Sequence, residues 1–214
     1  MGKDISKGYY DMEIDLLGLV EENGLVQESF YLNDLKQRKL FLYEDVTQEA
    51  VSELVRHIIQ YNRMDGALPP EERQPICLFI ASNGGEIDAG FMLIDVIKSS
   101  KTPVYTVNMG YAYSMGFLIE LAGHKRFAMP HAKYLMHDGS YGTYDSGAKA
   151  QDKLLFDKQV MARIRDFVLD NSKLTGEEYD SKLRIEWYMF NDEAKEKGFV
   201  DYIIGEDCEL GEII

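Results

Sequence analysis

The sequence lacks several features that would assign it to a class at once. Across its 214 residues, no apolar run approaches the roughly 18 residues of a membrane-spanning helix. The N-terminal stretch MGKDISKGYYDMEID is charged and polar, unlike a secretory signal. There is no GxxxxGK[ST] phosphate loop and no HExxH metal-binding pair. We therefore expect no membrane segment, no metal, no bound nucleotide and no other cofactor.

Basic residues and cysteines are also scarce. The chain has 23 Lys and Arg against 37 Asp and Glu, a net charge of −14, so its surface repels nucleic acid and anionic lipid. Its two cysteines, Cys77 and Cys208, lie far apart in the sequence, and we interpret them as reduced thiols in a cytoplasmic protein. The hydrophobic content of 45% is enough for one sizeable core.

What the sequence does contain is an alternation of apolar strands and helices. Short apolar runs at 38–43 and 76–81 predict strands, the second covered on both faces. Between them, a cap at Asp45 or Thr47 precedes a helix whose apolar residues follow helical spacing. Further strands are expected at 102–110, 125–130 and 132–137, and helices at 86–100, 114–123, 148–170, 175–183 and 191–197. This pattern indicates one α/β domain with mostly parallel strands.

Two segments fall outside this alternation. Residues 1–28 have few apolar clusters and predict an arm or flexible segment. The segment RMDGALPPEERQP, residues 63–75, is rich in glycine and proline and predicts a loop.

Ser114 stands at the head of an apolar helix, in the stretch GYAYSMGFLIELAG. A serine there can simply cap the helix, because its oxygen accepts from free backbone N–H groups of the first turn. It can also be a nucleophile, which requires a histidine base and an orienting acid. In α/β-hydrolases the triad residues follow one another along the chain as serine, acid and histidine. In this chain only Glu120 could then be the acid, and it lies on the same predicted helix as Ser114, so we exclude that order.

The chain has four candidate bases: His57, His124, His131 and His137. His137 ends a predicted strand and precedes the turn DGSYG, a position at which α/β sheets place functional groups, so we favour it. An oxyanion hole needs backbone N–H groups. The Gly84-Gly85 turn and the N–H of Met115 can supply them, although two glycines can also serve only a tight strand-to-helix turn.

Taken in order, these motifs resemble the ClpP family, the proteolytic subunit of the Clp protease, over about residues 30–205. The stretch FIASNGGEIDAGFMLIDVIKSSKTPVYTVNMGYAYSMGFLIELAGHKRFAMPHAKYLMHDG contains the Gly-Gly turn, the AxSMG serine and a strand ending in Met-His. The segment MFNDEAKEKGFVDYII resembles the closing segment of the family.

The resemblance implies a ClpP/crotonase-like α/β fold of repeated ββα units with a protruding handle helix at 148–170. The peptidase domain would span 29–214, behind an arm or axial segment at 1–28. The resemblance further implies Ser114 as nucleophile, His137 as base, and Gly85 and Met115 as oxyanion donors.

Glu186 falls where the family usually has an aspartate. It is the expected third triad member, with Asp138 and Asp180 as the next candidates. A substrate strand is expected along GGEID, at Gly84, Glu86 and Ile87, and along the loop that leads into the handle.

The resemblance also implies an assembly and a partner. In the family the handle helix packs two seven-membered rings back to back, and an ATP-driven AAA+ unfoldase docks on the flat face. An apolar face on the handle is expected at Val160, Met161, Ile164, Phe167 and Val168. A core helix of a monomer is the alternative explanation for this face. The expected activity is that of a serine endopeptidase on peptides and unfolded proteins. A catalytically inactive ring component, favoured by Glu186, and an acyl-CoA-processing crotonase relative are the alternatives.

Overall fold

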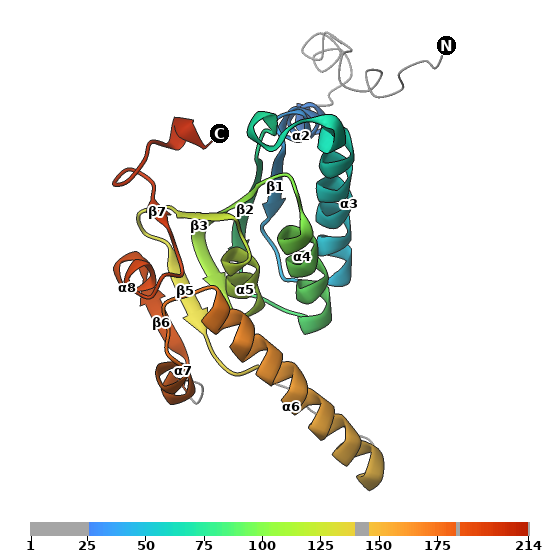
Figure 1. Cartoon of the computed structure of the whole chain (residues 1–214), viewed down its shortest axis with the longest axis vertical. Helices are drawn as coiled ribbons and strands as arrows, with labels where there is room; N and C mark the ends of the chain where they lie inside the picture. Colours follow the sequence, from blue (N-terminus) through green and yellow to red (C-terminus); the bar gives the residue numbers. More distant parts are fainter. Residues whose placement is uncertain (1–25, 140–145, 183–184, 214) are drawn as a thin grey trace.

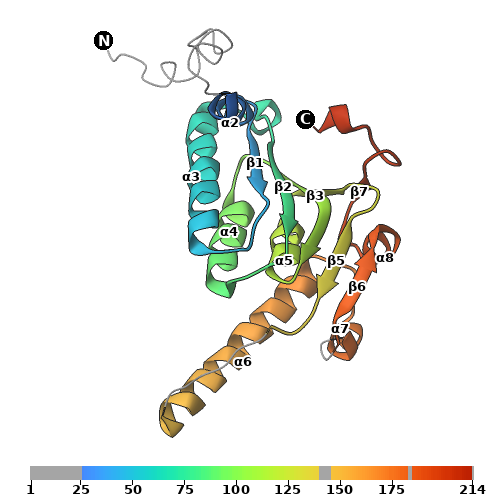
Figure 2. The same ribbon diagram turned by 180° about the vertical axis from the view of Figure 1, so that it is seen from behind.

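A parallel sheet with helices on one side organises the chain, as Figures 1 and 2 show for a computed structural model that describes residues 26–139, 146–182 and 185–213. The strands are β1 (Lys39–Leu42), β2 (Ile76–Ser82), β3 (Val104–Tyr113), β4 (Lys125–Ala128), β5 (Lys133–Met136), β6 (Trp187–Phe190) and β7 (Tyr202–Ile203). The helices are α2 (Val26–Lys36), α3 (Gln48–Met64), α4 (Ile87–Ser99), α5 (Met115–Leu121), α6 (Gly147–Asp170), α7 (Gly176–Lys182) and α8 (Asn191–Glu196). Among these helices, none is both long and apolar enough to cross a membrane.

The seven strands form one sheet in the order β1-β2-β3-β4-β7, with β5 and β6 branching from β3. The first half of β3 pairs with β4, and its last residues pair with β5. All of these pairings are parallel, and β6 runs antiparallel to β5. The prediction of a mostly parallel sheet is confirmed, and the antiparallel β6 is the exception.

Strand β2 is covered on both faces, as its apolar run predicts. Ile76, Leu78 and Ile80 belong to the core under the helices, whereas Cys77 and Phe79 pack on the opposite face with the C-terminal segment. Alternate side chains of a strand point to opposite faces, so both faces must be apolar when both are covered.

Other boundaries are only partly as expected. Thr47 caps α3, and its Oγ1 accepts from the N–H of Ala50 at 3.2 Å. Strand β3 continues to Tyr113, three residues beyond the predicted end at 110. Helix α2 starts at Val26, inside the segment expected to be an arm. Residues 1–25 lie outside the described residues.

The handle helix α6 projects from the body of the molecule in both views (Figures 1 and 2). The apolar face expected to hold a ring together belongs instead to the domain core. Ile164 and Val168 are buried there, and Val160, Met161 and Phe167 pack against them. The exposed apolar side chains lie further toward the N-terminal end of α6, at Leu154, Leu155 and Phe156.

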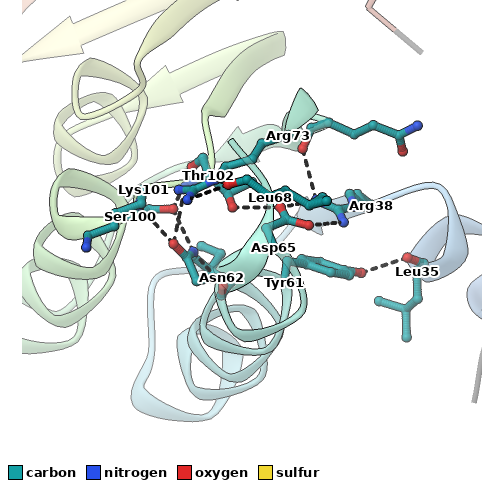
Figure 3. Close-up of polar contacts among 12 residues, drawn as sticks. Leu35, Arg38, Tyr61, Asn62, Asp65, Leu68, Arg73, Ser100, Lys101 and Thr102 are labelled. Carbon is teal, nitrogen blue, oxygen red and sulfur yellow. Dashed lines mark hydrogen bonds and ion pairs between the residues drawn. The ribbon is translucent and has the colours of Figure 1, made fainter. Parts of the chain in front are cut away.

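The segment after α3 is tied to the body by one buried carboxylate, Asp65 (Figure 3). Both guanidinium nitrogens of Arg38 donate to it at 2.6 Å, and the hydroxyl of Thr102 donates at 2.7 Å. Two short 3₁₀ turns, Asp65–Ala67 and Pro70–Glu72, follow within the predicted loop. Burial alone raises the pKa of Asp65, but the bonds from Arg38 and Thr102 outweigh it and hold the pKa below its ordinary value.

We predict that Asp65→Asn lowers the free energy of unfolding by about 3 kcal/mol at pH 7, because it removes the buried carboxylate charge from the ion pair with Arg38. A carboxylate with a lowered pKa stabilises the fold above its unfolded pKa, near 4, and loses this contribution as the pH falls. The difference in the free energy of unfolding between the wild-type protein and Asp65→Asn should therefore shrink toward pH 3. Urea unfolding at fixed protein concentration measures it, with Asp152→Asn on the exposed side of α6 as control. An equal loss at both pH values would contradict the assignment.

Candidate active site

Ser114 lies at the joint between β3 and α5, and its backbone is strained. It has φ 51° and ψ −119°, and among the described residues only Arg38 is another non-glycine with positive φ. The Ser114 side chain makes no capping hydrogen bond to α5. The interpretation of Ser114 as a helix cap is therefore wrong, and its hydroxyl is available for another partner.

That partner is His137. Its Nε2 lies 2.9 Å from Ser114 Oγ, within hydrogen-bond distance. The other candidates have different roles. His57 lies against Glu53 on α3, and Nδ1 of His124 accepts from the backbone N–H of Val104 at 3.1 Å.

The strand register explains why these side chains meet. Tyr113 of β3 pairs with Leu135 of β5, so Ser114 lies level with Met136, and His137 is the next residue along the chain. Met136 of β5 pairs with Trp187 in the antiparallel direction. The residue after Met136 is His137 and the residue before Trp187 is Glu186, so the ladder brings them together as well.

Glu186 faces His137 at a distance too long for a hydrogen bond. Oε1 of Glu186 lies 3.8 Å from His137 Nδ1, and the carboxylate side chain is 61% exposed. The remaining acids expected as candidates lie differently. Asp180 pairs with Arg165 at 2.7 Å, and Asp138 follows His137 with its side chain exposed.

Glu120 is excluded as the triad acid by its surroundings. It is buried on α5, and one of its oxygens accepts from the Tyr134 hydroxyl at 3.2 Å. Burial raises its pKa well above the ordinary range, which disfavours the carboxylate form. Glu120 therefore belongs to the core, where it bonds Tyr134 rather than His137.

The expected oxyanion donors come from two turns that touch each other. The N–H of Val46 donates to Gly84 O, and the N–H of Glu86 donates to Val46 O, both at 2.8 Å. This parallel bridge directs the N–H of Gly85, between them, away from Val46. Met115 begins α5, where backbone N–H groups have no partner within the helix.

The predicted substrate residues Gly84, Glu86 and Ile87 lie beside these donors, with one restriction. Because Gly84 O and Glu86 N–H already bond Val46, only the opposite edge of the turn can pair with a peptide. The loop leading into the handle is part of 140–145, outside the described residues.

A cavity of about 260 Å³ opens beside Ser114, His137 and Gly85. Its lining is mainly apolar and comes from α4, α5, β5, α6 and α7: Ile87, Met115, Phe117, Leu118, Met136, Met161, Ile164, Val168 and Tyr179. That Met161, Ile164 and Val168 of α6 line this cavity was not predicted from the sequence. Their spacing signalled an apolar helix face, but could not tell which surface it covers. A wider depression of about 820 Å³ around Lys98 and Arg126 is lined by His124 but by neither Ser114 nor His137.

The architecture places this site in a known class of fold. Parallel ββα units with a projecting helix match the solved structure of a ClpP1 mutant from Listeria monocytogenes, with a TM-score of 0.70. The match covers 86% of this chain and 99% of that structure at 22% identity. The fold is thus the ClpP-like α/β fold expected from the sequence.

The sequence comparisons then identify the family. The Clp protease family model matches residues 23–207. The ATP-dependent Clp protease proteolytic subunit 1 of Chlamydia muridarum is 32% identical over 79% of this chain and 88% of its own length. Subunit 1 of Corynebacterium jeikeium is 32% identical over 83% of this chain and 93% of its own length. The Streptococcus uberis proteolytic subunit is 28% identical over 90% of this chain and 97% of its own length. The chain belongs to the Clp protease family.

We predict that Glu186→Ala lowers kcat for a short peptide substrate about 100-fold while the fold stays intact. The loss should be smaller than the roughly 10⁴-fold effect of removing a buried triad acid, because the contact is long and exposed. Steady-state kinetics and circular dichroism measure the two parts of the prediction, with the exposed Glu206→Ala as control. Wild-type turnover in Glu186→Ala would show that the acid is another residue.

Proposed function

We propose that this chain is a serine endopeptidase subunit that cleaves peptides and unfolded proteins. The observation that carries the proposal is the 2.9 Å contact between Ser114 Oγ and His137 Nε2 at the mouth of an apolar cavity. Membership of a family whose relatives are named proteolytic subunits supports the same activity.

In the proposed reaction, Ser114 Oγ attacks the carbonyl carbon of a peptide bond while His137 Nε2 takes its proton. The backbone N–H groups of Gly85 and Met115 donate to the oxyanion that develops. His137 then passes the proton to the leaving amine and an acyl-enzyme remains. A water molecule, deprotonated by His137, hydrolyses the ester and releases the acid product. Glu186 stabilises the imidazolium that forms in each half of the reaction.

We further propose that the substrate is read mainly through its backbone. The free edge of the Gly84–Ile87 turn can pair with an extended peptide, which makes binding tolerant of sequence. The apolar cavity favours an apolar side chain next to the scissile bond, because no Asp, Glu, Lys or Arg of the described residues lines it.

The working form that we propose is a closed pair of stacked seven-membered rings in the cytoplasm. Leu154, Leu155 and Phe156 are 44%, 59% and 63% exposed on the projecting half of α6, and a neighbouring subunit in the ring would cover these three consecutive apolar side chains. With no phosphate loop in its sequence, the chain needs an ATP-driven AAA+ unfoldase as partner.

A second candidate function is that of a ring component with weak or no activity. The exposed carboxylate of Glu186 and its 3.8 Å distance from His137 favour it. The strained backbone of Ser114 and the short Ser114–His137 contact favour the active enzyme.

We predict that a fluorophosphonate probe labels Ser114 alone among the serines, because among the described serines only its oxygen is paired with a base beside two expected oxyanion donors. Peptide mapping by mass spectrometry locates the label, and Ser114→Ala should abolish both labelling and peptide cleavage. Full labelling of Ser114→Ala would contradict the proposed nucleophile. An unlabelled wild-type protein would favour the inactive ring component.

We also predict that the purified protein cleaves short peptides but spares a stably folded protein until a cognate unfoldase and ATP are added. The reason is enclosure of the sites in the ring. Light scattering should give a mass near 14 times that of the 24.5 kDa chain. A mass of one chain at micromolar concentration, or digestion of a folded protein without ATP, would contradict the enclosed-ring proposal.

A further inference from the structure

Glu186 has two carboxylate oxygens, and they have different partners. Oε1 faces His137 Nδ1 at 3.8 Å, whereas Oε2 accepts a hydrogen bond from the Tyr188 hydroxyl at 2.9 Å. Because the Glu186 side chain is 61% exposed, water and its other rotamers compete with the histidine. The bond to Tyr188 limits that freedom at the far end of the carboxylate.

The local sequence explains how Tyr188 reaches this oxygen. Glu186 directly precedes β6, and Tyr188 is the second residue of that strand. Residues two apart on an extended chain share a face. Trp187 and Met189, the alternate residues, are buried, so Glu186 and Tyr188 both point away from the core.

The ring of Tyr188 is itself braced by the strand that carries the nucleophile. It meets the ring of Tyr113 edge-on, with centroids 5.8 Å apart and an interplanar angle of 90°. Tyr113 in turn lies 5.4 Å from the ring of Tyr111. Since Tyr113 precedes Ser114, the end of β3 helps to fix both the serine and the phenol that holds the acid.

We propose that Tyr188 is a positioning residue, which orients the Glu186 carboxylate toward His137 through its hydroxyl. This inference rests on the proposed function and deepens it. A glutamate has one more methylene than an aspartate and therefore more rotamers to restrict, which is the freedom that the Tyr188 hydroxyl removes. The hydrogen bond to Glu186 also raises the pKa of Tyr188, so the phenol keeps its proton and remains the donor.

The test is a double-mutant cycle between Tyr188→Phe and Glu186→Ala, with peptide hydrolysis as the measurement. In the wild-type background, Tyr188→Phe should lower kcat about three- to tenfold, the effect of losing one hydrogen bond of ordinary net strength at an exposed site. KM should stay within about twofold, because Tyr188 does not line the cavity. In the Glu186→Ala background, the same substitution should change kcat by less than about twofold. Tyr202→Phe, in β7 on the other side of β4, is the matched control.

The rate of fluorophosphonate labelling at Ser114 gives a second readout that needs no peptide, and it should fall in parallel with kcat. Full activity of Tyr188→Phe, or an equal loss in both backgrounds, would overturn the inference and leave the proposed function intact. A wild-type protein that neither cleaves peptide nor reacts with the probe would overturn both. A change in KM without a change in kcat would show that Tyr188 contacts substrate instead, and it would also overturn the inference.

Discussion

The site depends on a close approach between the backbone at Gly84 and the backbone around Ser114, which leaves no room for a side chain at Gly84. A Cβ at this residue would lie 2.7 Å from Tyr113 O and 2.8 Å from Met115 N, closer than real Cβ atoms come. The strained joint that carries Ser114 occupies this space, and Gly84 itself has φ 95°. The glycine turn after β2 and the serine turn after β3 therefore constrain each other. Together they place the Gly85 and Met115 backbones beside one hydroxyl.

Strand pairing supplies the rest of the site, because three chain segments meet at one place in the sheet. Parallel pairing of β3 with β5 aligns the ends that carry Ser114 and His137. Antiparallel pairing of β5 with β6 then brings the start of β6, and with it Glu186, to the same end. A slip of one residue in either ladder would turn a proposed catalytic side chain to the other face of the sheet. The geometry of the site is therefore as precise as the register.

Much of this could be predicted from the sequence where one local rule decides the outcome. The apolar run of β2, the Thr47 cap and the strand-end position of His137 are examples of such rules. The sequence could not predict which oxygen of Glu186 faces His137, because that depends on Tyr188 and on a pairing between distant segments. Nor could it predict the use of the α6 face. The spacing of Met161, Ile164 and Val168 defines an apolar stripe, but not whether a neighbouring chain or the domain itself covers it.

Helix α6 contributes to the cavity at one end and carries exposed apolar side chains on its projecting half. Met161 lines the cavity, and Leu154 lies two turns earlier on the same helix, about 10 Å along its axis. One helix thus carries both a wall of the cavity beside Ser114 and an exposed apolar segment. The position of that wall is set by the packing of Ile164 and Val168 in the domain core.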